Sequence, residues 1–288
     1  MQIFALSDLH IDNQINHLWV GFISDTVYLK DTLIIGGDIS DDLEKLKSTL
    51  SSLRRKFHNI FFLPGNHELW VKNNEFNDSF EKFEIIMDLC KSLDIKTKPD
   101  KLGKEDSNPV WIIPLNSWYV KPEEGSESLF LPKNGEDESL SMWRDNELIR
   151  WPKFNSHNSA ADFFLEMNNE YLKGDYKEPV ISFSHFLPRQ ELMFPEKRDY
   201  KLLKKMDRHP AFNFSRVAGS LNLDKQIRSI GSAIHIYGHQ HRNRERNIDG
   251  VYYVSHCLGY PNERKLGLVR DAENGPKLIW DTSNRNND

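Results

Sequence analysis

Side chains that bind metal ions recur at the ends of five short apolar segments in this 288-residue sequence. They are carboxylates, imidazoles and one amide, with no thiolate among them. Mixed nitrogen and oxygen ligands suit manganese, iron, zinc or cobalt better than calcium, and they are too rich in nitrogen for magnesium alone. Eight such groups exceed the needs of one tetrahedral ion and fit two ions that share a bridging carboxylate. The groups are Asp8, His10, Asp38, Asn66, His67, His185, His239 and His241.

The apolar segments that carry these residues are predicted to be β-strands of an α/β protein. Between two of them, at 41–57, leucines recur at helical spacing, which favours strands that alternate with helices. Such alternation predicts a sheet with mostly parallel neighbours. Since ligands of open α/β sheets gather outside the carboxyl ends of the strands, the five segment ends are expected to meet. The segments are 2–7, 32–38, 59–65, 179–185 and 233–241.

Further helices and strands are expected around two polar stretches. The stretches, at about 119–150 and 186–215, are interpreted as insertions in a single domain that covers 1–288. The first insertion is acidic and rich in glycine, serine and proline, whereas the second carries many basic residues. The predicted helices are 78–93, about 158–173 and about 219–230, and the predicted strands are 110–115, 251–256, 265–271 and 276–281.

The motifs around the candidate ligands, taken in order, resemble the calcineurin-like metallophosphoesterase superfamily. The pattern of that superfamily is DxH, GD, GNH[ED], H and GHxH, and the resemblance extends from residue 2 to about residue 271. It implies an α/β fold, a four-layer α/β-β/α sandwich with mixed sheets and a dimetal site at one edge. The matching segments are DLH (8–10), GGD (36–38), GNHE (65–68), SH (184–185) and GHQH (238–241).

The resemblance also implies the cofactors and a role for each group. Two divalent metal ions are expected, manganese foremost, with iron, zinc, cobalt and nickel as alternatives. By motif, the roles divide as follows: Asp8, His10 and His241 would hold the first ion; Asn66, His185 and His239 would hold the second; Asp38 would bridge both; and His67 would stay unligated and act on the substrate.

The implied reaction is hydrolysis of a phosphate ester by a hydroxide that bridges the two ions. The cations lower the pKa of the bound water and neutralise phosphoryl oxygens. His67 would stabilise developing charge or protonate the leaving oxygen, and Asp38 would hold the bridge. Glu68 is expected to hydrogen-bond a nearby imidazole. The expected substrate is a small phosphomonoester or phosphodiester, nucleotides included.

Three further segments are similar to a narrower branch of uncharacterised calcineurin-like phosphoesterases, and that likeness implies no substrate. The protein serine/threonine phosphatases carry VDRG after their GD motif, whereas here ISDD follows Asp38. This departure argues against a protein-phosphatase activity. The branch segments are HFLPRQEL (185–192), DGVYYV (249–254) and GYPNER (259–264).

Four residues are predicted to contact the substrate. Asn116 and Trp118 follow the 110–115 strand, on the edge where the ions are expected. Trp118 would stack a base or sugar there, or else serve as a structural aromatic. Arg144 follows the acidic stretch. Arg189 begins the basic insertion, which would meet a second phosphate or an acidic partner, or else form a solvated helix. Its other basic candidates are Lys197, Arg198 and Lys201.

Composition limits the partners. A net charge of −5 and a pI of about 6.1 argue against a broad nucleic-acid surface. The basic insertion nevertheless leaves an RNA-end or nucleic-acid phosphoesterase as an alternative, and a non-catalytic metal-bound scaffold is another. No apolar run approaches a membrane span and no signal peptide precedes the first strand, so a cytoplasmic protein without membrane contact is expected. Cys90 and Cys257 are predicted to be reduced, and the oligomeric state stays open.

Overall fold

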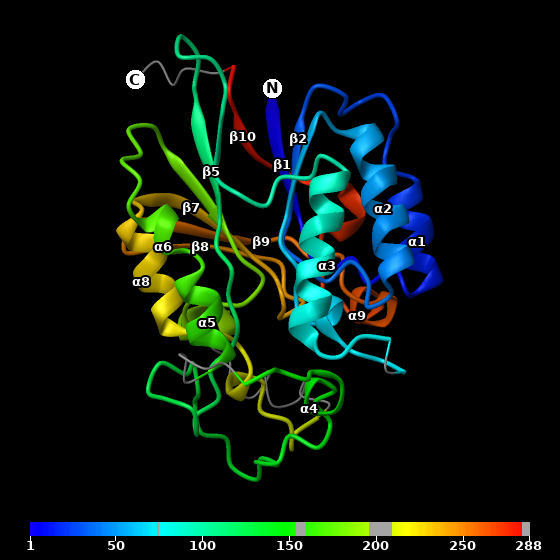
Figure 1. Ribbon diagram of the computed structural model, residues 1–288, viewed down its shortest axis with the longest axis vertical. Coiled ribbons are helices and arrows are strands. Elements are labelled where there is room, and N and C mark those ends of the chain that lie inside the picture. Colours follow the sequence, from blue (N-terminus) through cyan, green and yellow to red (C-terminus); the bar gives the residue numbers. More distant parts are fainter. Residues whose placement is uncertain (74, 154–158, 196–208, 284–288) are drawn as a thin grey trace.

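The computed structural model describes residues 1–73, 75–153, 159–195 and 209–283. Within them, two β-sheets pack face to face, and helices cover both outer faces (Figure 1). The predicted α/β fold with mixed sheets is confirmed. The basic candidates Lys197, Arg198 and Lys201 lie outside the described residues.

The first sheet brings three of the five motif-bearing segments to the same level. Its parallel strands β1, β2 and β3 are paired so that Leu6 lies opposite Ile35, which lies opposite Phe62. The chain therefore leaves all three strands at one edge, where the DLH, GGD and GNHE motifs begin. The order is β10 (Lys277–Asp281), β1 (Gln2–Leu6), β2 (Thr32–Ile35) and β3 (Asn59–Phe62), with β10 antiparallel to β1.

The second sheet carries the other two motif-bearing segments on neighbouring parallel strands. Phe183 of β6 lies opposite Ile236 of β7, so the SH and GHQH motifs also start side by side. A parallel bridge between Ser7 and Cys257 joins the two sheets at this edge. The order is β4 (Asp100–Leu102), β5 (Val110–Pro114), β6 (Val180–Phe183), β7 (Ser232–Tyr237), β9 (Val251–Ser255) and β8 (Arg244–Ile248), with β4 and β8 antiparallel to their neighbours.

The hydrophobic core has three parts, one between the two sheets and one between each sheet and its outer helices. The helices and sheets therefore form four layers. Apolar side chains of both sheets, such as Ile34 and Ile181, fill the space between them. The outer face of the first sheet packs on helices that include α2, and the outer face of the second packs on α8. The longer helices are α1 (Gln14–Gly21), α2 (Leu43–Lys56) and α3 (Ser79–Ser92) beside the first sheet, and α5 (Ala160–Glu166) and α8 (Leu221–Ser229) beside the second, where the short helix α6 (Asn169–Leu172) also lies.

Helix α2 shows how the sequence specifies these elements. The Asp42 carboxylate accepts a hydrogen bond from the Lys45 amide and caps the first turn, while three basic residues occupy the last turn. Leu46, Leu50 and Leu53 are buried along one face, as their spacing predicts. The shortest helical turns are η1 (His67–Leu69), α4 (Asp145–Leu148), η2 (Gln190–Met193), η3 (Phe214–Arg216), α9 (Pro261–Lys265) and η4 (Ala272–Asn274).

Two predictions of secondary structure need correction. The strand expected at 265–271 is wrong, because Pro261 opens helix α9 and Gly267 follows it with a φ of 67°. The helix expected at about 158–173 is divided, in its described part, into α5 and α6. Asn168 lies between them and bonds the backbone of Asn116 from both ends of its amide. The two cysteines are unpaired and buried, as expected.

The two insertions meet at one end of the molecule, which Figure 1 shows as green and yellow loops below the sheets. The amide of Asp137 donates to the carbonyl of Ala211 over 2.7 Å. The amide of Leu131 donates to the Ser215 hydroxyl over 2.9 Å. The first insertion is therefore fixed by the second rather than solvated on all sides. Among the described residues, no helix combines the length and apolar character that crossing a membrane requires.

Candidate metal centre

The predicted ligands lie on tight loops that begin where the strands end. Five of them have left-handed backbones, with φ between 42° and 71°. A non-glycine residue rarely adopts this conformation, and such strain concentrates at functional sites. The surrounding loops therefore hold these side chains in directions that relaxed turns would not give. The five are Asp8, His10, Asp38, His239 and His241.

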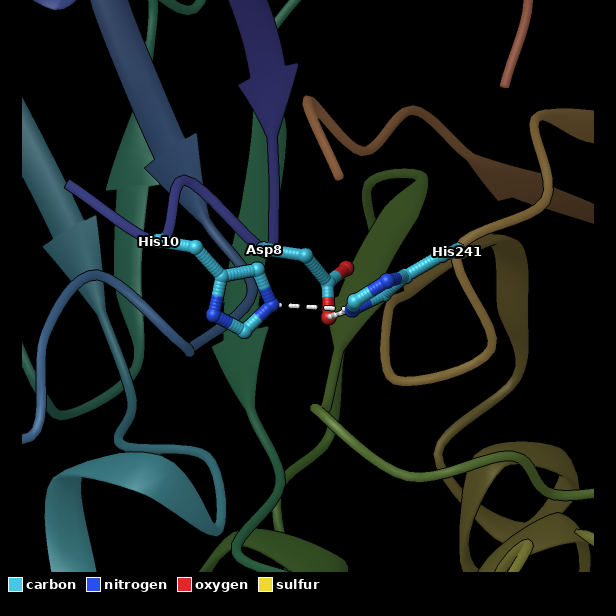
Figure 2. A group of neighbouring side chains, drawn as sticks. All are labelled: Asp8, His10 and His241. Carbon is cyan, nitrogen blue, oxygen red and sulfur yellow. Dashed lines mark hydrogen bonds and ion pairs between the residues drawn. The ribbon is translucent and has the colours of Figure 1, made fainter. Parts of the chain in front are cut away.

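Asp8, His10 and His241, here termed the Asp8 group, converge from two loops. Figure 2 shows the three side chains directed toward one another, the first two from the loop after β1 and the third from the loop after β7. The Nε2 atoms of His10 and His241 lie 2.8 Å apart, and His241 Nε2 lies 3.5 Å from Asp8 Oδ1. One atom from each residue lies within 4.8 Å of the others, so the group could hold one ion.

Asn66, His185 and His239, here termed the His185 group, form a second cluster beside the first. The Nε2 atom of His185 lies 3.2 Å from Asn66 Oδ1 and 3.4 Å from Asp38 Oδ2. The same Asp38 oxygen lies 4.0 Å from His10 Nε2, so Asp38 faces both groups. Atoms of Asp38, His185 and His239 also lie within 4.8 Å of one another.

Three of the predicted histidine ligands have one ring nitrogen fixed by a hydrogen bond. Nδ1 of His185 donates to the carbonyl of Gly36 over 2.8 Å, and Nε2 of His239 donates to the carbonyl of Val217 over 2.9 Å. Nδ1 of His241 bonds a carboxylate oxygen of Glu263 over 2.7 Å. These bonds select the tautomer that leaves a lone pair directed into the cluster.

The electrostatics keep both carboxylates ionised despite their burial. Burial alone would raise the pKa of Asp8, but the hydrogen bond and charge of His241 lower it to about 2. Burial would likewise raise the pKa of Asp38, but the imidazoles of His185 and His67 hold it well below its usual range. Both groups are therefore anionic at neutral pH, as metal ligands must be.

The imidazoles divide into two protonation states. Burial lowers the pKa of His10 well below its usual range and that of His239 to about 3, so both rings are neutral. Burial acts in the same direction on His241, but its bonds to Asp8 and Glu263 raise its pKa to about 10. A cation in the Asp8 group would displace that proton, which is the usual coupling of metal binding to proton release.

The residues fit the divalent ions that the motifs imply. The donors are imidazoles, ionised carboxylates and an amide oxygen, which is a chemistry suited to transition metals. Glycines allow these donors to approach one another. A Cβ at Gly65 would lie 2.2 Å from Asp38 Oδ1, and one at Gly238 would lie 2.8 Å from Asp8 Oδ2. At Gly37, whose φ is 82°, a Cβ would lie 2.6 Å from His185 Nδ1.

His67 lies at the rim of both groups. Its Nε2 atom is 3.9 Å from Asp38 Oδ2, and its ring packs on Trp70 with the ring centres 3.7 Å apart. Its side chain keeps 16% of its surface exposed, against 3% for His10 and 1% for His185. His67 is thus the more accessible imidazole, although its nitrogen is also close enough to Asp38 and His10 to join a metal cluster.

The expected role of Glu68 needs correction. Its carboxylate bonds no imidazole; it accepts four backbone N–H groups of the GGD and GNHE loops, from residues 38, 39, 40 and 65. Burial and the nearby charge of Asp38 raise its pKa to about 7. Glu68 therefore holds together the two loops that present Asp38 and Asn66.

Two predicted substrate residues, Trp118 and Asn116, are buried and bonded or packed within the fold. Trp118 is 4% exposed and packs edge-on against Trp151 and Phe186, so it presents no open face for a base. Asn116 is buried, and its amide group and backbone bond Asn168. Both line a small internal cavity together with His185. The core position of Trp118 favours the structural alternative.

The two arginines predicted to contact the substrate, Arg144 and Arg189, lie in different surroundings. Arg189 is paired with three carboxylates and lines an outer cavity rather than the candidate centre, so its charge is already neutralised. Arg144 is exposed, with one ion pair of 3.5 Å to Glu147, and stands beside Asp145, which contacts the His185 group. The three carboxylates are Glu191, Asp224 and Asp249.

Several contacting residues escaped the sequence analysis. Asp145 bonds Asn66, Glu263 bonds His241, and the Tyr260 ring stacks on His10 with the ring centres 4.4 Å apart. Glu263 and Tyr260 lie in GYPNER, a segment that marked a family branch but carried no assigned role. Nothing in the sequence around Asp145 distinguishes it from the other acidic residues of its insertion.

Two mixed sheets with adjoining clusters of histidine and aspartate at one edge define a metallohydrolase of the four-layer α/β class. The sequence profile described as calcineurin-like phosphoesterase matches residues 1–243. The chain therefore belongs to the calcineurin-like phosphoesterase family and is a hydrolase that acts on phosphoester bonds. The recognition made from the motifs is confirmed.

Individual relatives add detail. The chain is 24% identical over 292 residues to the "[Acyl-carrier-protein] phosphodiesterase PptH" of Mycobacterium tuberculosis, covering 91% of this chain and 78% of that protein. It is 36% identical over 75 residues, or 24% of its length, to an uncharacterised metallophosphoesterase of Helicobacter pylori, 20% of which is covered. The crystal structure of the phosphopantetheinyl hydrolase PptH from Mycobacterium tuberculosis has the same fold, with a TM-score of 0.72 and 20% identity over 96% of this chain and 95% of that one.

Proposed function

We propose that this chain is a dinuclear metal-dependent phosphodiesterase and that its substrate is a phosphopantetheinyl group carried by a protein. The observation that carries the proposal is the convergence of the Asp8 group and the His185 group on Asp38. The substrate follows from the likeness, over 91% of the chain, to a relative named as an acyl-carrier-protein phosphodiesterase. This substrate is larger than the small ester or nucleotide that the motifs alone favour.

In this proposal the two groups hold one divalent ion each, and Asp38 contacts both ions. Manganese is our first choice of metal because the donors mix nitrogen and oxygen, with iron, zinc, cobalt and nickel as alternatives. Bound ions of this kind supply a water of lowered pKa and neutralise charge on the phosphoryl oxygens. Loading the purified protein with each metal in turn would rank them by bound stoichiometry.

His67 is the residue that we assign to proton transfer. As the oxygen of water bonds to phosphorus and the ester P–O bond breaks, the leaving oxygen must gain a proton. Burial lowers the pKa of the His67 imidazole, so the ring is neutral beside Asp38; it can take a proton from the water that adds and pass one to the leaving oxygen. The products are an alcohol on the carrier and a phosphomonoester. Arg144, exposed next to Asp145, remains our candidate for a contact with the substrate.

We also propose that the chain forms one domain in which both insertions take part. Their described residues bond each other, and the first insertion reaches the His185 group through Asp145. A carrier protein would then meet the insertions as well as the strand ends. Limited proteolysis would test this, since a single domain should resist cleavage within 119–150 until the whole chain unfolds.

The deciding experiment compares substrates on the manganese-loaded protein. A phosphopantetheinylated carrier protein should lose that group, as followed by intact-protein mass spectrometry, faster than bis(p-nitrophenyl) phosphate or a cyclic nucleotide is hydrolysed. Hydrolysis of the small diesters without any release from carrier proteins would reject the substrate. No turnover with any ester and any divalent metal would reject the enzyme and favour a metal-bound scaffold.

A further inference from the structure

Asp145 stands out as a buried carboxylate to which no metal-ligand motif gives a role. It is the first residue of α4, within the 119–150 insertion, and only 3% of its surface is exposed. Among the described residues no lysine or arginine pairs with it. Its partners are three hydrogen-bond donors of uncharged side chains. They are Asn66 Nδ2 at 2.9 Å, Trp70 Nε1 at 2.6 Å and the Tyr119 hydroxyl at 3.2 Å.

The bond to Asn66 decides which end of the amide faces the His185 group. A carboxamide presents either an oxygen or an NH2 group, and only the oxygen can bind a cation. Asp145 Oδ1 accepts from the NH2 group, so Asn66 Oδ1 points the other way, to within 3.2 Å of His185 Nε2. Without an acceptor at this place, the amide would lose its preference between the two orientations.

The same carboxylate oxygen also fixes the surface beneath His67. It accepts from the indole N–H of Trp70, and the His67 ring packs on that indole with the ring centres 3.7 Å apart. One oxygen atom therefore supports both the amide of the His185 group and the accessible imidazole. An acceptor from a distant segment is needed here because residues 66–70 form a tight turn with no carboxylate free to serve.

We propose that Asp145 is a positioning residue, by which the acidic insertion sets the orientation of the Asn66 amide and of the Trp70 surface under His67. The proposal rests on the proposed function in so far as it takes Asn66 to be a ligand. It gives the acidic insertion a defined place in the centre, which its sequence alone did not indicate.

The first test measures metal binding, so that it stands apart from any failure to identify the substrate. Asp145→Leu has a similar size and accepts no hydrogen bond. Isothermal titration of the metal-free protein with Mn²⁺ should show one of two binding steps weakened by about 10- to 100-fold. Asp145→Asn keeps an acceptor oxygen for Asn66 and Trp70 and should stay within about threefold of the wild type. Two unchanged steps in Asp145→Leu would overturn the proposal, as would an equal loss in Asp145→Asn.

A matched control and a second variant keep this test decisive. Glu147→Gln removes a carboxylate from the same short helix, where it pairs with the exposed Arg144, and should bind both ions normally. A loss there would assign the effect to general charge and reject the proposal. If Asp145→Leu fails to fold, Asp145→Ala leaves room for water at the three donors and should show the same weakened step. Normal binding by a folded Asp145→Ala would overturn the proposal.

The support of His67 is tested separately by Trp70→Phe. This change keeps an aromatic ring under the imidazole and removes the N–H donor. Both metal-binding steps should be unchanged, while kcat for an alkyl phosphodiester, whose leaving oxygen needs a proton, falls about tenfold at constant KM, since only the alignment of the imidazole is disturbed. An unchanged kcat would remove this half of the proposal.

Discussion

The Asp8 group and the His185 group, the two halves of the candidate centre, are held in place by different hydrogen-bond acceptors. In the Asp8 group, the carboxylate of Glu263 bonds His241 directly. In the His185 group, backbone carbonyls accept from both imidazoles. The only member of this group that bonds the Asp145 carboxylate is Asn66. Both carboxylates come from segments outside the family motifs, one after β9 and the other from the acidic insertion.

The difference teaches which ligands depend on one particular acceptor for their orientation. An imidazole has one N–H to dispose of, and either a backbone carbonyl, as for His185 and His239, or a carboxylate, as for His241, can accept it. An amide has two equivalent-looking ends, so its orientation depends on a dedicated acceptor on one side. We therefore expect metal binding in each half to be weakened independently, except where Asp38 is changed.

The largest effect is expected for Asp38→Asn, because this residue faces both halves. A neutral amide cannot balance two cations, so both ions should be lost. Turnover of bis(p-nitrophenyl) phosphate should fall by at least about 10³-fold, since several kcal/mol of transition-state stabilisation depend on the ions. Metal analysis after gel filtration measures the first effect. Asp42→Asn keeps the cap of α2 and should retain two ions; a doubly loaded Asp38→Asn protein would contradict the shared role.

His67→Ala should separate catalysis from both halves. Both ions should remain bound, while kcat falls by about 10²- to 10⁴-fold because the leaving oxygen loses its proton donor. The loss should be greater for an alkyl ester than for a p-nitrophenyl ester, whose leaving group needs no proton. His58→Ala, at an exposed position just before β3, is the control. Loss of an ion in His67→Ala would instead make His67 a ligand.

Glu263→Gln should weaken the Asp8 group alone. The amide can still accept from His241, but the charge-assisted bond is lost, so we expect about tenfold weaker binding in one step of a Mn²⁺ titration. The affected step should differ from the one that Asp145→Leu weakens. Glu273→Gln changes an exposed carboxylate nearby in the sequence and should bind normally. If Glu263→Gln and Asp145→Leu weaken the same step, the division into two halves is wrong.

The smallest effect on turnover is expected for Arg189→Met, which lies outside both halves. Its guanidinium serves three carboxylates, two of them well exposed, so its loss should cost about 1–2 kcal/mol of stability. Thermal unfolding should shift down by a few degrees while kcat and KM stay at the wild-type values. A raised KM for the carrier protein would restore Arg189 as a substrate contact.

The sequence by itself determined most of the strands, most of the helices and the set of motif residues that meet at the sheet edge. Those features are local: apolar runs specify strands, leucine spacing specifies α2, and the motifs follow the strand ends directly. The strand expected at 265–271 failed because Pro261 and Gly267 outweighed the apolar alternation around them.

Tertiary structure decided what surrounds the ligands. Asp145 reaches Asn66 across 79 positions of sequence, and Glu68 turned to backbone amides rather than to an imidazole. Trp118 became part of the core, and Arg189 found acidic partners in distant segments. A carboxylate or an aromatic ring has no fixed role until burial and neighbours are known, because hydrogen bonds and charge act through space. The cluster of motif residues was therefore legible in the sequence, and its supports were not.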